Sequence, residues 1–457
     1  MSSYVYTARD LWSAEDEIDR GPYLAIGFTL MALKYNLERL VAGLAFGHSW
    51  SVLAHYLHTP DPSAVAGDTR FYATMVAMTL PFLWTGVALT IRRLRSAGLP
   101  IAFVALFFVP VVNLIFFLLL AALPAAEPRV QARSSFLSRL IPRSAPGSAL
   151  FVLLLGGIAS VALGVLSTRV FFNYGSTLFI GLPFCLGLTA ALVHGYHATR
   201  SWFECAAVAC MTVFFSGLVL FATAVEGVIC LALALPLALP LAVMGGTLGW
   251  MIQRLPHRAP ATTASLLLLF AAIPALIGAE SEDGIVDRAR PVRTSIDIAA
   301  APETVWRNVV AFSDLPAPAH WIFRLGFAYP LRATIVGRGV GAVRHCEFTT
   351  GPFVEPITVW DEPRLLKFSV TSQPPPMRET SWYPDMRPAH LDGFLVSEGG
   401  QFELTPLPDG RTRLTGTTWY RHEIRPSWYW RPWSNFIIHR IHQRVLAHIQ
   451  SLSQGRA

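Results

Sequence analysis

Long apolar runs separated by short polar segments fill the first 279 residues of the chain. A helix rises about 1.5 Å per residue, so a run of roughly 20 apolar residues crosses the hydrocarbon core of a bilayer. About seven runs reach that length, at about 24–46, 71–91, 149–168, 176–194, 203–225, 227–252 and 261–279. We therefore predict an α-helical polytopic membrane domain over residues 1–279.

One further apolar run, at 101–123, contains Pro110 and Asn113 at its midpoint. A straight spanning helix would place a missing backbone donor and a polar amide in hydrocarbon there. If the run spans, six arginines lie on the inner side of the membrane and eight on the outer side. If it returns as a re-entrant hairpin, twelve lie inside and two outside, in agreement with the positive-inside rule. This count favours about seven spans plus one hairpin, with the C-terminal domain outside the cytoplasm.

After Ala279 the pattern changes to an acidic linker at 280–290 and then to short alternating segments, which predict a second domain at 291–453. The first segment, 291–300, reads as a strand and runs into a helix that starts at Pro302 with an acidic first turn. Further strands are predicted at about 340–348, 354–360, 364–372, 391–407 and 412–423.

The segment 425–452 predicts one long amphipathic helix that closes the domain. Large side chains recur at three- and four-residue steps, which places them on one helical face. They are Trp430, Trp433, Ile437, Ile441, Val445, His448 and Leu452. We expect this face to pack against the strands that precede it and to leave a hollow there.

Composition supports a membrane protein, because 53% of the residues are hydrophobic, only 14% are charged and the mean hydropathy is +0.45. The net charge of +7 comes mostly from residues 1–279, which hold 16 Lys+Arg against 11 Asp+Glu. These arginines flank the apolar runs, so we predict a membrane partner and no nucleic-acid partner. The five cysteines are scattered and predict no disulfide framework.

Two short motifs lie in the N-terminal part. Arg20-Gly21-Pro22-Tyr23 precedes the first apolar run, and Arg92-Arg93-Leu94-Arg95-Ser96-Ala97-Gly98 follows the second. They resemble the hallmarks of a small bacterial inner-membrane family of unknown function that carries an R-R-L-x-x-x-G loop. The likeness covers roughly residues 18–128 and implies a multi-pass protein of the bacterial inner (plasma) membrane.

The order strand, helix, many strands, long helix, with the opening Ala301-Pro302-Glu303-Thr304-Val305-Trp306, resembles the START-like or helix-grip superfamily. That group includes polyketide cyclases and lipid-transfer domains. The resemblance implies an α+β fold in which a seven-stranded antiparallel sheet curls around the C-terminal helix and encloses an apolar cavity. The sequence shows six strands, so we expect the stretch 391–407 to divide at Gly399-Gly400.

Candidate ligand-binding residues are aromatic, apolar or polar side chains that this fold could point into the cavity. They are Trp321, Phe327, His345, Glu347, Trp382, His390, Phe394, Trp419, Trp433, Ile437 and Ile441. His345 and Glu347 lie two apart on one strand face and are also candidates for a catalytic acid/base pair. The irregular stretch from Pro374 to Pro388 is a candidate lid.

No nucleophile elbow, phosphate loop, zinc signature or dinucleotide fingerprint is present, so the sequence predicts no metal and no cofactor. We expect a membrane-anchored protein that binds or transfers a hydrophobic ligand such as a lipid or an isoprenoid-like molecule. A cyclase- or dehydratase-type enzyme is the first alternative. The second is a ligand-sensing domain coupled to a transport bundle.

Lys34 and Glu38 are a candidate membrane site, because they lie one helical turn apart near the middle of the first apolar run. Charges at that depth are costly and usually face a bundle interior or a water-filled path. One interpretation is a neutralised pair that fixes helix packing. The other is a transport or proton-relay role.

Overall fold

The computed structural model describes residues 12–48, 69–123, 136–254, 258–281, 289–383 and 386–455. The chain divides into two compact units, one formed by Met1–Val225 with Leu231–Gly284 and the other by Glu226–Cys230 with Ile285–Ala457. Most of the predicted linker, residues 282–288, lies outside the described residues.

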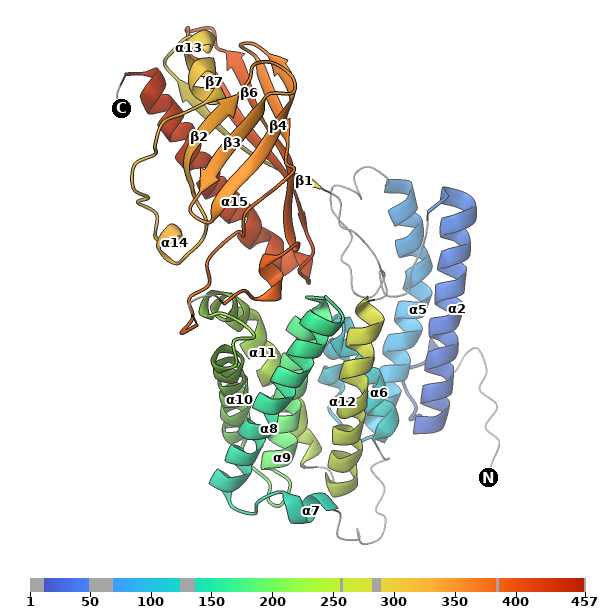
Figure 1. The fold of residues 1–457 in the computed structure, drawn as a ribbon. Coiled ribbons are helices and arrows are strands. Elements are labelled where there is room, and N and C mark those ends of the chain that lie inside the picture. Colours follow the sequence, from blue (N-terminus) through green and yellow to red (C-terminus); the bar gives the residue numbers. More distant parts are fainter. Residues whose placement is uncertain are drawn as a thin grey trace. The chain divides into compact units, whose positions relative to one another are not determined.

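The first unit is an α-helical membrane domain (Figure 1). Its described helices are α2 (Arg20–Phe46), α5 (Thr69–Ser96), η1 (Ile101–Phe108), α6 (Val112–Ala122), α7 (Phe136–Leu140), α8 (Ala145–Val165), η2 (Leu166–Val170), η3 (Thr177–Gly181), α9 (Leu182–His194), α10 (Trp202–Ala222), α11 (Val228–Ile252) and α12 (Arg258–Ser281). Within the described residues, five helical segments are long and apolar enough to cross a membrane: 69–96, 145–170, 177–194, 202–222 and 228–252.

Helix α8 has an exposed apolar face and a buried face of small residues. Leu150, Leu154 and Ile158 follow one another at four-residue steps and are exposed. Gly156 and Ser160 lie on the opposite face and are buried, and Gly156 faces Leu186 of α9 and Thr212 of α10. An apolar outer face with small residues at the inner contacts is the pattern of a helix that meets lipid on one side and packs on the other.

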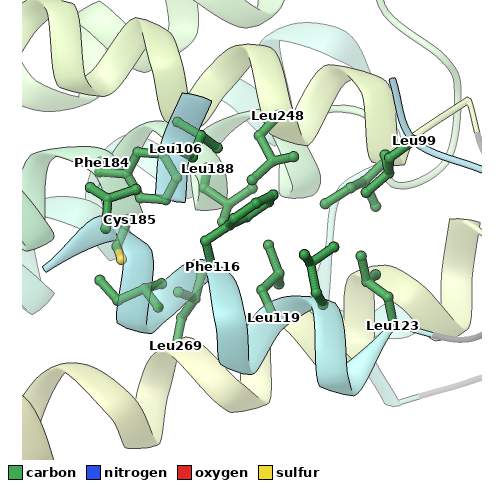
Figure 2. Packing of buried hydrophobic residues seen from close by; sticks show 14 of the residues in the cluster. Leu99, Leu106, Phe116, Leu119, Leu123, Phe184, Cys185, Leu188, Leu248 and Leu269 are labelled. Carbon is green, nitrogen blue, oxygen red and sulfur yellow. The ribbon is translucent and has the colours of Figure 1, made fainter. Parts of the chain in front are cut away.

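Apolar side chains from α6 fill the centre of this unit (Figure 2). Phe116 and Leu119 pack among Leu188 of α9, Leu248 of α11 and Leu269 of α12. A helix that is apolar nearly all round is enclosed either by protein or by lipid. In α6 the residues Val112, Ile115, Phe116, Leu119 and Leu120 are buried, so much of this helix is enclosed by protein.

The apolar run at 101–123 is broken at its midpoint. A 3₁₀-helix, η1, ends at Phe108, Val111 has a φ of 67°, and α6 begins at Val112 with 11 residues. A helix of that length measures only about 16 Å, roughly half of the hydrocarbon core. The break at Pro110 agrees with the expected bend, while the re-entrant path itself stays a prediction.

The second unit has a helix-grip fold. All strand pairs are antiparallel, and the seven strands lie in the order β1-β7-β6-β5-β4-β3-β2. The elements are β1 (Arg290–Ile298), α13 (Pro302–Val310), α14 (Trp321–Arg324), β2 (Pro330–Val336), β3 (Val343–Phe348), β4 (Gly351–Asp361), β5 (Leu365–Ser369), η4 (Ala389–Leu391), β6 (Leu395–Pro406), β7 (Thr412–His422) and α15 (Ser427–Ser453). The fold predicted from the order of elements is confirmed.

Helix α15 lies along this sheet (Figure 1) and closes its core. Val445, Leu446 and Ile449 belong to one cluster of buried residues with Ile298 of β1 and Leu414 of β7. The buried face of α15 differs in part from the predicted one. It contains Trp430, Ser434, Ile438, Val445, Leu446, His448 and Ile449, so the large residues Trp433, Ile437 and Ile441 lie at its margin.

The expected division of the stretch 391–407 is wrong, because β6 runs unbroken through Gly399 and Gly400. A Cβ atom at Gly400 would lie 2.6 Å from the ring of Phe368, and one at Gly399 would lie 2.6 Å from the Phe368 carbonyl oxygen. The two glycines therefore permit close packing of β6 against β5. The seventh strand is β2, an edge strand of seven residues that was not among the predicted strands.

Candidate functional site

An apolar cavity of about 120 Å³ lies in the second unit between α15 and the sheet. Most of its walls come from β3 to β7 and the middle of α15. The lining residues are Arg344, Cys346, Phe348, Phe353, Glu355, Phe368, Val370, Ser397, Gly399, Gln401, Phe402, Gly416, Thr417, Thr418, Ile438, Ile441, His442, Val445 and Leu446.

A buried ion pair forms part of the cavity wall. Arg344 of β3 and Glu355 of β4 are direct cross-strand partners, and the Arg344 guanidinium donates a hydrogen bond to the Glu355 carboxylate. The guanidinium also lies 5.4 to 5.6 Å from the ring centres of Phe312, Phe368 and Phe402. Burial is the largest influence and opposes the charge on Arg344, but the adjacent Glu355 carboxylate and Cys346 together outweigh it, so the pKa of the guanidinium is raised. Arg344 therefore stays charged inside an apolar pocket.

Arg344 retains one unused donor. Among the described residues, its Nε atom is buried and has no hydrogen-bond partner. A buried donor without a partner costs about 1–3 kcal/mol, so such groups commonly meet a water molecule or a ligand. Thr417 Oγ1, in the same lining, is also buried without a partner among the described residues, so the largely apolar site has two points for recognition of a polar atom.

His442 of α15 is a second polar group in the lining. Its Nδ1 lies 3.0 Å from Thr294 Oγ1, and its Nε2 lies 2.8 Å from Thr418 Oγ1. Two hydroxyls can satisfy a neutral imidazole, with one nitrogen donating and the other accepting. Burial, with a smaller contribution from nearby His439, lowers the pKa of His442 to about 4. The cavity therefore holds a neutral histidine at ordinary pH.

Cys346 is the thiol in the lining, and it is not suited to nucleophilic chemistry. Burial raises its pKa to about 12, because the thiolate would lose solvation in the apolar interior. With Arg344 paired and His442 kept neutral chiefly by burial, the described lining residues fit recognition of an apolar molecule better than covalent catalysis.

The predicted acid/base pair lies on the other face of β3. Arg344, Cys346 and Phe348 line the cavity, so the alternating residues His345 and Glu347 point away from it. Glu347 forms a partly exposed ion pair with Arg332 of the edge strand, at 2.9 Å. The expected orientation of His345 and Glu347 is therefore wrong. A cyclase-type reaction in this cavity would not have these two residues as its acid/base pair.

Most of the other predicted ligand-binding residues lie elsewhere in the second unit. Trp321 and Trp382 are exposed, and Trp419 lies beside Lys367, whose Nζ is 5.3 Å from its ring centre. Trp433 and Ile437 are half-buried, Phe327 and Phe394 are buried outside the lining, and His390 is buried in a separate polar cluster. Ile441 is the predicted residue that lines the cavity.

The main polar lining residues, Arg344, Glu355 and His442, were not predicted. One sequence signal was available, because alternation along β3 places Arg344 on the same face as the apolar Cys346 and Phe348. An arginine in phase with apolar residues predicts a buried, paired charge. No comparable signal marks Glu355, whose burial depends on its cross-strand partner.

The first unit contains a second cavity, of about 300 Å³, beside the predicted membrane site. Lys34 lines it, and the Lys34 Nζ atom lies 2.6 Å from Glu38 Oε1. Thr79 of α5 donates a hydrogen bond to the same carboxylate at 3.1 Å. The two charges are thus paired inside the helical bundle, as both interpretations of this site require.

Comparisons with known proteins give similarities for both parts of the chain. Truncated norcoclaurine synthase from Thalictrum flavum is 13% identical, covering 37% of this chain and 96% of that chain with a TM-score of 0.23. The Zhui aromatase/cyclase from Streptomyces sp. R1128 is 14% identical, covering 37% and 95% with a TM-score of 0.24. No curated protein matches the sequence.

The predicted resemblance of roughly residues 18–128 to a membrane family of unknown function is confirmed. The motifs that carried it, at Arg20 and Arg92, both lie inside the matched region. Residues 12–131 match the family described as "Protein of unknown function (DUF805)".

Proposed function

We propose that the second unit binds a hydrophobic ligand in the cavity beneath α15, and that the first unit anchors this binding domain in a membrane. The observation that carries the proposal is an apolar cavity whose lining includes two buried polar atoms without a hydrogen-bond partner among the described residues, the Nε of Arg344 and the Oγ1 of Thr417. Ligand sites are typically apolar with a few placed polar groups that fix orientation. The ligand class that fits is an apolar molecule with a carbonyl or carboxylate oxygen.

The volume of the cavity bears on the ligand. Sites for drug-sized molecules measure about 300–1,000 Å³, and this cavity measures about 120 Å³. It accepts a small apolar group or one end of a longer chain, so a whole lipid or isoprenoid-like molecule requires the walls to move apart. The irregular stretch between β5 and β6, which we predicted as a lid, is the proposed moving part.

A membrane location supports transfer as well as binding. Burial of apolar surface is worth about 25 cal/mol per Å² in either the bilayer or the cavity. Exchange between two apolar surroundings therefore has a small net free energy. We propose that this exchange occurs on the outer side of a bacterial inner membrane, as the arginine count predicts.

The test uses the detergent-solubilised full chain and a cavity-filling variant. Solvent extraction and mass spectrometry should detect a co-purified hydrophobic molecule. A fluorescent fatty acid should bind to the protein, and the extracted molecule should displace it. Val445→Phe should weaken binding at least tenfold, because it fills the cavity with a ring. Val340→Phe is the matched control, since Val340 is 69% exposed and lies outside the lining.

Two outcomes would contradict the proposal. One is a protein that carries no hydrophobic molecule and does not bind the fluorescent fatty acid. The other is equal binding by Val445→Phe and the wild type when both have the same thermal midpoint.

A further inference from the structure

Three potential metal ligands meet in a part of the second unit that the cavity does not include. Glu226 and Cys230 come from the short segment Glu226–Cys230, and His390 comes from η4. One carboxylate oxygen, the Cys230 sulfur and one imidazole nitrogen all lie within 4.8 Å of one another. Glu226 and His390 are buried.

We propose that Glu226, Cys230 and His390 bind a zinc ion. Zinc prefers this mixture of oxygen, sulfur and nitrogen donors and commonly takes three protein ligands plus a fourth, open position. The site shares no residue with the cavity lining. Its proposed consequence is to fasten the irregular stretch before β6 to the segment Glu226–Cys230.

The distances suit a tetrahedral ion. His390 Nδ1 lies 3.2 Å from Glu226 Oε2. Two ligands bound to zinc at about 2.0–2.1 Å with a tetrahedral angle lie about 3.3 Å apart. The sulfur position requires only a small inward movement, because no two atoms of the set lie more than 4.8 Å apart.

Glu379 is the carboxylate nearest to the outer ring nitrogen of His390, the position at which zinc-bound histidines usually have a partner. Its Oε1 lies 3.7 Å from His390 Nε2, the ring nitrogen that faces away from Glu226. The backbone N–H groups of Ile229 and Cys230 donate hydrogen bonds of 3.1 Å to the Glu379 carboxylate. A carboxylate on the outer nitrogen orients the imidazole and leaves Nδ1 for the metal.

Charge provides a further argument. Two carboxylates and a thiol surround His390, and the side chains of Glu226, Glu379 and His390 are at least nine-tenths buried. Buried negative groups are costly unless a cation compensates them. A divalent ion coordinated by Glu226 and a Cys230 thiolate would neutralise the inner donors directly.

The sequence did not indicate this site because Cys230 and His390 are 160 positions apart. Zinc motifs are recognised from short ligand spacings, and Glu226-x-x-x-Cys230 alone matches none of them. The fold brings the third ligand from an irregular stretch.

The test measures metal bound to the full-length, tag-free protein. After exposure to zinc and removal of free metal, elemental mass spectrometry should find about one zinc per chain. Cys230→Ser and His390→Ala should each lower the bound zinc at least tenfold. Cys210→Ser and His345→Ala are the matched controls, because neither residue belongs to the cluster, and both should keep the full amount.

Cobalt gives a readout that does not depend on variants. The wild-type protein loaded with Co²⁺ should show a sulfur-to-cobalt charge-transfer absorption, which Cys230→Ser should abolish and Cys210→Ser should retain. A wild-type protein that binds no zinc and shows no such absorption overturns the proposal. So does equal zinc content in Cys230→Ser and Cys210→Ser. Fatty-acid binding in the cavity is measured separately, so either proposal can fail alone.

Discussion

At the scale of single residues, Arg344 shows why a charge can persist in an apolar wall. It faces Glu355 directly across two paired strands, and three aromatic rings surround its guanidinium. The pair satisfies both charges locally, so the low dielectric of the interior strengthens their attraction. Removal of one partner would leave the other buried and uncompensated.

Arg344→Met should therefore lower the free energy of unfolding of the second unit by about 3–5 kcal/mol. The double variant Arg344→Met/Glu355→Met should recover most of this loss, because two apolar side chains replace the pair without a stranded charge. Hydrogen exchange of β3 and β4 amides measures the effect. The control Arg332→Met breaks a partly exposed ion pair and should cost less than about 1 kcal/mol. Equal losses for Arg344→Met and Arg332→Met would contradict the account.

His442 predicts a pH dependence. Its pKa of about 4 lies below the unfolded value of about 6.5, so the unfolded chain binds more protons between those two values. The contribution of His442 to the free energy of unfolding is then fully present above pH 6.5. It falls, by up to about 3 kcal/mol, as the pH drops towards 4. The thermal midpoint of wild type should fall more steeply over this range than that of His442→Gln, which cannot titrate. Parallel curves would show that His442 does not contribute.

At the scale of elements, α15 was predicted in length and position, but its buried face was only partly right. The sequence favoured a row of the largest side chains, including Ile437. The structure buries Ser434, Ile438 and Ile449 instead. A serine in the seam interrupts the apolar pattern, and spacing alone cannot distinguish two adjacent rows on a helix.

Substitution of single isoleucines on α15 tests this assignment. Ile449→Ala should cost about 2–5 kcal/mol, because Ile449 is fully buried in the core of the second unit. Ile437→Ala, the matched control, should cost less, because Ile437 is only half-buried. Thermal unfolding of both variants gives the comparison. A larger loss for Ile437→Ala would restore the face predicted from the sequence.

The strands show the same limit of sequence reasoning. Order and type of the long elements followed from hydrophobic periodicity, which reports which side of a segment is buried. β2 was missed because its buried residues, Pro330 and Ala333, are three positions apart and do not alternate. Gly399-Gly400 was misread because close packing against Phe368 leaves no trace in the pattern. Which residues line the cavity depends on the face of the strand to which each residue points and on cross-strand partners such as Arg344 and Glu355. Those partners are fixed only when the strands pair.

At the scale of the whole molecule, the division into two units constrains the path of the chain. The chain leaves the second unit after Cys230 and re-enters it at Ile285. We infer that the intervening segment crosses the membrane an even number of times, since both of its ends join the same unit. α11 is one of the five helices apolar enough to cross, so α12, with 24 residues, is the candidate for the return. A helix of that length spans about 36 Å, enough for the hydrocarbon core.

Reporter fusions to truncated chains test this path and the predicted sidedness together. Alkaline phosphatase, which is active only outside the cytoplasm, should be active when fused after Ala224 or Ala457 and inactive after Arg254. A fluorescent reporter that folds only in the cytoplasm should show the reverse, because Arg254 and Arg258 are expected on the inner side. If Arg254 and Ala457 give the same result, α12 does not cross. If all three results are inverted, α12 crosses but the second unit faces the cytoplasm, and the proposed ligand exchange then takes place at the inner leaflet.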